Sequence, residues 1–223
     1  MTPERFAKLR RTLLRRQPDL TVLADSVNKS HNVSAILRSA DAVGIHVIHA
    51  LTTSGAMRRH HMIAGGATRW VDVVLHPSTE VAIARLRADG WRLVAAHGGP
   101  QARDFRDVDY TERVAIVVGA ELVGLSTAAI EQADVHVAIP MHGLGQSLNV
   151  SVAGAVILFE AERQRAAAGL YDQSRLSPDE FERTLFEWCY PDIAERCRAL
   201  RRPYPALTAD GTMTENPLVA ITR

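Results

Sequence analysis

Three segments of the 223-residue sequence join polar side chains to glycines beside apolar runs. The first, residues 28–44, holds Asn32 and, six residues later, Arg38. An amide can position a ligand, and a guanidinium is a permanent cation that recognises phosphate. The segment predicts a helix with Asn32 as its N-cap and Gly44 just after its end. Taken alone, it also fits an ordinary capped helix with a surface arginine.

The second segment is an apolar run, residues 114–118, that ends in Gly119 and, two residues later, Glu121. In open α/β sheets, ligands bind beyond the carboxyl ends of the strands, so this segment predicts a ligand-binding loop. A turn that uses permissive glycines is the alternative.

The third segment begins with an apolar run that Pro140 stops. A glycine-rich loop follows and leads into a helix whose first turn carries Ser147, Asn149 and Ser151. Backbone N–H groups at such a loop can hold a polar ligand. Helix capping alone is the alternative here.

Signatures of several other sites are absent from the sequence. It contains no G-x-G-x-x-G between a strand and a helix and no Walker A motif, which disfavours NAD and ATP sites. Its nine histidines form neither H-E-x-x-H nor a cluster at zinc spacing. Cys189 and Cys197 match no metal spacing, and we interpret both as core thiols. We therefore expect no metal.

Short apolar runs alternate with helical stretches between residues 20 and about 165. Several of the runs show little polar alternation, which is typical of strands covered on both faces. The pattern predicts an α/β fold with a mostly parallel sheet. The expected strands are residues 21–24, 45–51, 71–75, 92–96, 114–118 and 135–139, and the expected helices are residues 33–43, 80–89, 126–133 and 148–165.

Helices are also expected at both ends of the chain. Thr2 can cap a first helix that buries Phe6, Leu9 and Leu13, and Ser177 can cap a helix near the C-terminus, with another after residue 191. This organisation predicts three parts: an N-terminal basic helix at residues 1–19, an α/β domain at 20–168 and a C-terminal helical extension at 169–223.

The charge of the chain is unevenly distributed. The whole chain carries +1, whereas residues 1–16 hold six basic residues and one acid, which makes that segment +5 and the remainder −4. Such a patch suits a polyanionic partner or is simply a solvated helix face. No apolar run is long enough to cross a bilayer and no signal-peptide core is present, so we expect a cytoplasmic protein without membrane contact.

Together and in this order, the segments resemble the SpoU/TrmH branch of the SPOUT methyltransferases over residues 20–165. The first family motif corresponds to Asn32 and Arg38. The second, G-x-E-x-x-G-[LI], corresponds to Gly119, Glu121, Gly124 and Leu125. The third corresponds to Ile139, Pro140, Met141, Gly143 and residues 147–153.

The resemblance implies a C-terminal trefoil knot in the α/β domain and a homodimer. It also implies that S-adenosyl-L-methionine binds in a bent form against the knot. The expected cofactor contacts are mainly backbone groups around Ala96, Gly119, Glu121, Ile139, Met141 and Leu148.

The activity implied by the resemblance is methyl transfer to a ribose 2′-hydroxyl of RNA. Arg38 is the family's proposed base, but a guanidinium holds its proton, so it can instead clamp a phosphate and polarise the hydroxyl. Asn32 would position Arg38 or the ribose. The residues expected to orient loops and the target nucleotide are Glu121, Ser147 and Asn149.

Residues 15–22, 104–106 and 109–111 and the helical tail resemble family members that methylate guanosine 18 in the D-loop of tRNA. The same transfer on ribosomal RNA or another tRNA position is an alternative, as is a non-catalytic RNA-binding protein of this fold. The basic residues expected to contact tRNA are Arg10, Arg11, Arg15 and Arg16.

Overall fold

A computed structural model of the chain describes residues 1–52, 70–120 and 123–218. The chain divides into two compact units. The sheet unit is Gln17–Leu170, and the terminal unit joins Met1–Arg16 to Tyr171–Arg223. Glu121, an expected cofactor and catalytic residue, lies outside the described residues.

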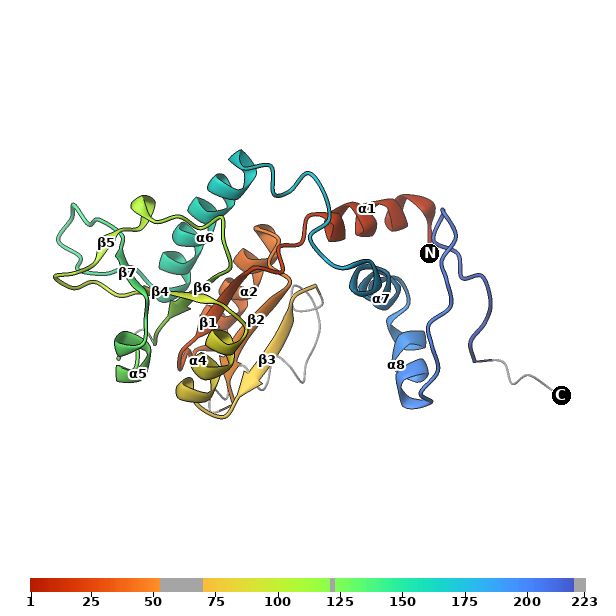
Figure 1. The fold of residues 1–223 in the computed structure, drawn as a ribbon, viewed down its shortest axis with the longest axis horizontal. Helices are drawn as coiled ribbons and strands as arrows, with labels where there is room; N and C mark the ends of the chain where they lie inside the picture. The colour runs from red at the N-terminus through yellow and green to blue at the C-terminus, as the bar shows by residue number, and fades with distance from the viewer. Residues whose placement is uncertain (53–69, 121–122, 219–223) are drawn as a thin grey trace. The chain divides into compact units, whose positions relative to one another are not determined.

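The sheet unit is built on a seven-stranded sheet in the order β3-β2-β1-β6-β4-β7-β5, in which every pairing is parallel (Figure 1). The expectation of a mostly parallel sheet is therefore confirmed, although the short strand β5 was not expected. The strands are β1 (Leu20–Ala24), β2 (Val47–Leu51), β3 (Asp72–His76), β4 (Arg92–Ala96), β5 (Arg103–Asp104), β6 (Val114–Val118) and β7 (Val135–Ala138).

Strands β1 and β6 form the centre of the sheet. All five residues of each strand are buried, and they pair in register from Leu20 with Val114 to Ala24 with Val118. Apolar runs without alternation suit this position because both faces are covered. The carboxyl ends of these parallel strands lie at one edge of the sheet, where ligands bind in open α/β folds.

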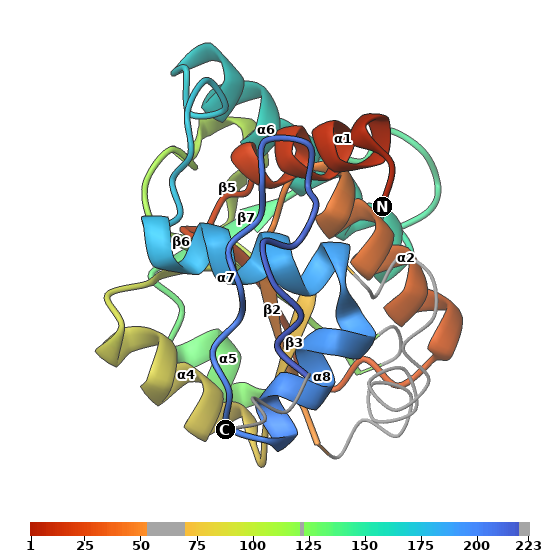
Figure 2. The same ribbon diagram turned by 90° about the vertical axis from the view of Figure 1, so that its right-hand side faces the viewer.

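Helices cover both faces of the sheet (Figures 1 and 2). One core cluster packs α2 (Ser30–Ala42) and α6 (Val150–Ala167) against side chains such as Val22 and Ile116. The other packs α4 (Thr79–Ala88) and α5 (Thr127–Glu131) against alternate residues such as Leu23 and Val117. A 3-10 turn, η2 (Phe105–Asp107), follows β5.

The start of α2 differs from the prediction. The helix begins at Ser30 with Lys29 as its cap residue, so Asn32 is not the N-cap and lies inside the first turn with a buried side chain. No proline or glycine lies between Lys29 and Asn32 to stop the helix from extending backward. The predicted end is confirmed, because Gly44 has a φ of 82° directly after the cap residue Val43.

A buried arginine near the end of α6 holds the sheet unit together. Arg165 is fully buried, and its guanidinium donates to Asp19 Oδ1 at 2.7 Å, Gln17 Oε1 at 3.0 Å and the Tyr110 carbonyl at 2.9 Å. These partners lie before β1 and before β6. The sequence pattern placed Arg165 at the end of a helix but did not reveal this role.

The terminal unit packs α1 (Pro3–Leu14) against α7 (Pro178–Cys189), which α8 (Pro191–Ala199) follows (Figure 2). The predicted caps are confirmed, because Thr2 accepts from Arg5 N and Ser177 accepts from Glu180 N. The predicted stripe on α1 is buried as expected, and both cysteines are buried free thiols. The trefoil knot stays a prediction. In the described part of the chain, no helix is both long and apolar enough to cross a membrane.

Candidate functional site

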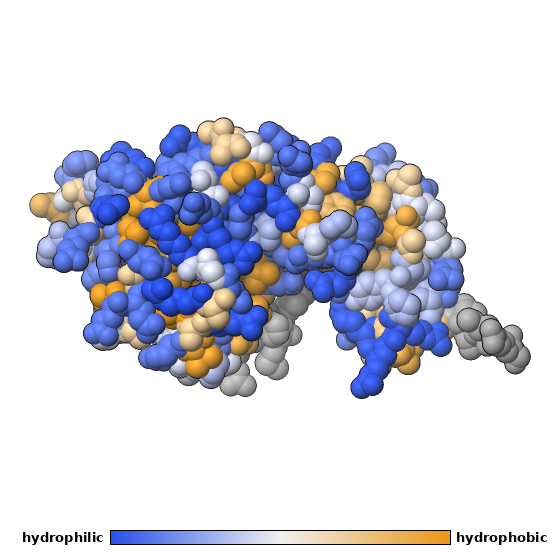
Figure 3. Space-filling model, viewed as in Figure 1, coloured by the Kyte–Doolittle hydropathy of each residue, from blue (hydrophilic) through white to orange (hydrophobic). Residues whose placement is uncertain are grey.

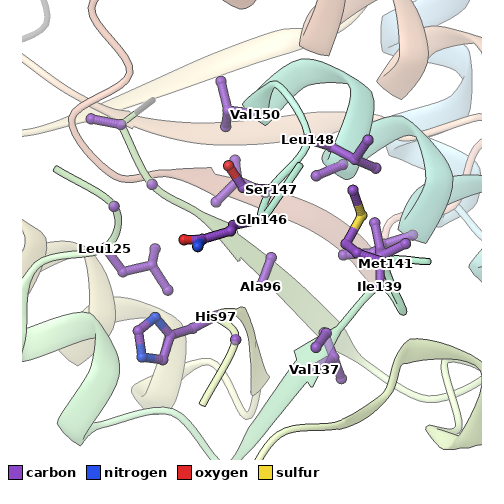
Figure 4. A pocket seen from close by; sticks show the side chains of 18 residues that line it. Ala96, His97, Leu125, Val137, Ile139, Met141, Gln146, Ser147, Leu148 and Val150 are labelled. Atoms are coloured by element: carbon purple, nitrogen blue, oxygen red, sulfur yellow. The ribbon is translucent and has the colours of Figure 1, made fainter. Parts of the chain in front are cut away.

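A cavity of about 270 Å³ opens at the carboxyl ends of β4, β6 and β7, between the loops that follow these strands (Figure 4). Every described residue expected to contact the cofactor lines it: Ala96, Gly119, Ile139, Met141 and Leu148. The expected residue Ser147 lines it too. Residues that follow β4 and β6 therefore meet residues of the third motif in one pocket, whereas the first motif segment, residues 28–44, does not line it.

One side of the pocket is lined by apolar side chains, whereas the other includes a histidine. In Figure 4, the side chains of Ile139, Met141 and Leu148 gather on one side, while His97 and Leu125 lie on the other. Apolar side chains beside glycine-rich loops suit a ligand with a flat apolar part and polar groups that backbone atoms recognise. The volume lies near the lower end of the range for small-molecule sites, about 300 Å³.

The loop after β6 needs glycine for a steric reason. A Cβ atom on Gly119 would lie about 2.3 Å from the carbonyl carbon of Gly124. The two backbones approach closely because Ala120 and Gly124 exchange two N–H···O bonds, at 2.9 and 2.8 Å. Gly124 itself has a φ of 75°, which side chains rarely adopt. Glycine at these two positions therefore lets the described parts of the loop approach each other closely, and both glycines line the pocket.

His97 and Gln146 line the pocket but were not singled out in the sequence. The backbone N–H of His97 donates to the Ala95 and Val137 carbonyls at 2.9 and 3.1 Å. Its ring lies edge-on to that of His136, with 5.8 Å between the centroids. Since His97 directly follows a predicted strand, its place beyond the carboxyl end of that strand was a usable signal.

Two of the expected catalytic residues are directly connected. Asn149 caps α6, because its Oδ1 accepts from the backbone N–H and the hydroxyl of Ser151, at 2.9 and 2.6 Å. Its Nδ2 donates to Asn32 Oδ1 at 3.1 Å. Ser147, two residues before the cap, lies in the pocket wall. The asparagine pair therefore links helix α2 to the loop that forms one side of the pocket.

Arg38 lies apart from the pocket in the single chain. Its side chain is exposed on α2 and is not among the described residues that line the cavity. Within the described ranges it forms no hydrogen bond or ion pair, so its guanidinium is available to an external anion.

The basic helix of the terminal unit presents fewer arginines than expected. Arg10, Arg11 and Arg15 are exposed. Arg16 is fully buried, with its guanidinium carbon 5.1 Å from the centroid of the Trp188 ring. The prediction that Arg16 contacts RNA is therefore wrong for this conformation, because packing on an aromatic side chain removes it from the surface.

Two buried histidines pair outside the pocket. His49 on β2 and His76 on β3 form a hydrogen bond of 2.8 Å between Nδ1 and Nε2. Burial, and then the proximity of His76, lower the pKa of His49 to about 4. Burial also lowers the pKa of His76. Among residues 1–52, 70–120 and 123–218, no three His, Cys, Asp or Glu side chains are grouped to hold a metal ion.

The fold and the pocket define a parallel α/β protein with a small-molecule-sized pocket where the loops after β4, β6 and β7 meet. The SpoU rRNA Methylase family matches residues 19–159, and the SpoU rRNA methylase C-terminal family matches residues 163–216. The chain belongs to the SpoU rRNA Methylase family.

Relatives found by sequence and by structure have named activities. A tRNA (guanosine(18)-2′-O)-methyltransferase of Escherichia coli K12 is 45% identical over 213 residues, which is 95% of this chain and 93% of the relative. The TrmH/SpoU tRNA modifying enzyme of A. aeolicus is 38% identical, with a TM-score of 0.77 over 85% of this chain and 97% of that one. The SpoU methyltransferase AviRb of Streptomyces viridochromogenes, in complex with the cofactor AdoMet, is 30% identical, with a TM-score of 0.58 over 70% of this chain and 61% of that one.

Proposed function

We propose that this protein transfers a methyl group from S-adenosyl-L-methionine to the ribose 2′-hydroxyl of guanosine 18 in tRNA. The observation that carries the proposal is the pocket, where all the described residues assigned to the methyl donor meet. The likeness to a tRNA (guanosine(18)-2′-O)-methyltransferase over 95% of the chain supports the choice of substrate.

The chemical character of the pocket lining suits the methyl donor. Leu125, Ile139 and Leu148 offer apolar surface to an adenine ring, and Gly119 lets a ligand approach the backbone. The bound cofactor supplies an electrophilic methyl group on a sulfonium, whose loss leaves a neutral thioether. The chain's residues must then hold the ribose hydroxyl in line and relieve it of its proton.

We assign Arg38 to binding and activating the RNA substrate. Its exposed guanidinium can hold a phosphate of the target nucleotide and polarise the 2′-hydroxyl. Asn32 and Asn149, bonded at 3.1 Å, orient the helix that carries Arg38 relative to the pocket loop. Ser147 lies in that loop and faces the same ligand space. Glu121 keeps its proposed role from the sequence motif.

The exposed arginines of α1 and its C-cap residue Arg15 provide the tRNA contact, which is one of the two interpretations that the charge distribution left open. Arg10, Arg11 and Arg15 can each neutralise a phosphate, and such contacts dominate the affinity of proteins for nucleic acids. The site of action we propose is the cytoplasm, where tRNA is the substrate.

We also assign a homodimer, through the outer side of α6. Apolar residues occur all round this helix, and a helix of that kind is usually buried. Two of them, Val152 and Phe159, are nevertheless 47% and 51% exposed in the single chain. Figure 3 shows apolar areas among the hydrophilic ones on one face of the sheet unit. A second copy can cover α6 and bring its own Arg38 to a pocket that lacks one.

The test is methyl transfer from labelled S-adenosyl-L-methionine to purified tRNA, with the modified nucleotide mapped. A transcript with a 2′-deoxy nucleotide at position 18 is the matched control and should accept no label. Label at another tRNA position or only on ribosomal RNA would overturn the substrate assignment. Binding of RNA without any transfer would overturn the catalytic one. Sedimentation should give a dimer, and a monomer at working concentrations would contradict the assembly.

A further inference from the structure

Asp25 is a buried carboxylate with no role in the motifs. It is the first residue after β1, and none of its surface is exposed. The next residue, Ser26, has a φ of 59°, a left-handed conformation that is uncommon for residues other than glycine. The chain therefore turns sharply just after Asp25, at the carboxyl edge of the sheet.

Asp25 forms hydrogen bonds on both sides of a group of residues that line the pocket. Its backbone N–H donates to the Val118 carbonyl at 2.8 Å, directly before this group. Its Oδ2 accepts from the backbone N–H of Ser126 at 2.7 Å, directly after the group. Between these two points lie four residues that line the pocket: Gly119, Ala120, Gly124 and Leu125.

The other carboxylate oxygen anchors Asp25 to a separate helix. Oδ1 accepts from the Thr79 hydroxyl at 2.7 Å, and Thr79 is the first residue of α4. A buried carboxylate is costly unless it is hydrogen-bonded, so its partners keep it in one place. Ser126, directly after these pocket residues, is thus tied through Asp25 to β1 and α4, which contribute nothing to the pocket lining.

We propose that Asp25 is a positioning residue for methyl-donor binding, which holds the pocket residues Gly119, Ala120, Gly124 and Leu125 in place through its bonds to Val118 and Ser126. The inference rests on the proposed function, since it takes the pocket to bind S-adenosyl-L-methionine. Without the carboxylate, the N–H of Ser126 loses its acceptor, and the neighbouring pocket residues Gly124 and Leu125 are no longer held in place. The affinity for S-adenosyl-L-methionine therefore falls, whereas the affinity for tRNA, which other elements bind, does not.

Two matched pairs of variants test this. Asp25→Ala removes the acceptor, whereas Asp25→Asn keeps Oδ1 for the Ser126 N–H and lets Nδ2 donate to the Thr79 hydroxyl, which also accepts. Ser126→Pro removes the donor at a φ of −65°, the value that proline prefers. Ser126→Ala keeps that donor and loses only the hydroxyl that caps α5.

Calorimetry with S-adenosyl-L-homocysteine measures the affinity for the cofactor. Steady-state kinetics of methyl transfer then give the KM for the cofactor, the KM for tRNA and kcat separately. We expect Asp25→Ala and Ser126→Pro to weaken cofactor binding by about 10-fold or more, the effect of losing a hydrogen bond to a charged group. Asp25→Asn and Ser126→Ala should stay near the wild type, and the KM for tRNA should not change in any variant.

A control separates this effect from general loss of stability. Tyr110→Phe removes a buried hydrogen bond of 2.8 Å to the Phe105 carbonyl; neither residue lines the pocket, so the KM for the cofactor should not change. If Asp25→Ala does not fold, the comparison of Ser126→Pro with Ser126→Ala tests the inference instead. Wild-type cofactor affinity in folded Asp25→Ala or Ser126→Pro would overturn the inference, as would equal loss in Asp25→Asn. A wild-type protein that binds no cofactor would instead overturn the proposed function.

Discussion

Asn149 donates from Nδ2 to Asn32 Oδ1 at 3.1 Å, although 117 residues separate the two in the sequence. The bond joins the N-cap of α6 to the first turn of α2, the helix that carries Arg38. This hydrogen bond therefore connects the loop that lines the pocket to the helix that carries the exposed Arg38 guanidinium.

Replacing Asn149 by Asp tests that link. Aspartate caps a helix as well as asparagine does, but it offers an acceptor where Asn32 needs a donor. We expect the free energy of unfolding to fall by about 1 kcal/mol or less and kcat to fall more than the KM for the cofactor. Asn149→Ala, which also loses the cap, should cost a further ~1 kcal/mol in urea unfolding. Unchanged kcat in Asn149→Asp would show that the asparagine bond does not serve catalysis.

Removing the Arg38 guanidinium should separate binding from chemistry. Arg38 does not line the pocket, so Arg38→Ala should bind S-adenosyl-L-homocysteine normally. We expect methyl transfer to fall by at least about 100-fold, the lower range for removing one group that stabilises charge in the transition state. Arg38→Lys is the matched variant, which keeps the charge but loses bidentate phosphate binding. Single-turnover rates with tRNA check this, and near-normal turnover in Arg38→Ala would remove Arg38 from the mechanism.

Neutralising the exposed arginines of α1 should change the salt dependence of tRNA binding. In the triple variant Arg10→Gln, Arg11→Gln and Arg15→Gln, the slope of log affinity against log salt should fall by about 0.7 to 0.9 per lost phosphate contact. Arg16→Gln is the contrast, because Arg16 is buried against Trp188 and its loss should lower thermal stability. Filter binding at several salt concentrations measures the slope, and an unchanged slope in the triple variant would show that these arginines do not touch phosphate.

The buried histidine pair should make stability depend on pH. Burial and the proximity of His76 lower the pKa of His49 from 6.5 to about 4, so the folded protein binds fewer protons than the unfolded chain in this range. The free energy of unfolding is therefore greatest above pH 6.5 and falls by roughly 2 kcal/mol as the pH drops toward 4. His49→Gln, which does not titrate, should flatten this dependence in urea unfolding between pH 7 and 4.5. Equal pH dependence in both proteins would contradict the assignment.

Arg165 and Arg163 on α6 form a matched pair for stability. Arg165→Met leaves Asp19 and several carbonyls without their buried donor, which should cost about 3–5 kcal/mol. Arg163→Ala removes the exposed arginine of an ion pair with Glu160, which keeps its bond from Gln164, and should change stability by less than about 1 kcal/mol. Denaturant unfolding of both variants provides the comparison. Similar small effects would show that the buried network contributes little.

The sequence by itself determined most of the helices and strands, and the edge of the sheet at which a ligand-binding loop was expected. Apolar runs predicted β4 and β6 with their observed ends, and the caps at Thr2 and Ser177 lie where local patterns placed them. The motif loops follow strands, and the carboxyl ends of parallel strands share one edge, so neighbouring loops meet there. These features depend on residues that are close in sequence, which is why pattern and spacing suffice.

Only the tertiary structure decided which polar side chains are free and which are held. Asn32 lies inside α2 and meets Asn149, Arg16 packs on Trp188, and Asp25 bonds to Val118 and Ser126 on either side of pocket residues. Each contact joins segments far apart in the chain, and its formation depends on how helices and strands pack rather than on any local preference. A buried polar group is stable only where such packing supplies its partner, so its role is decided by the fold as a whole.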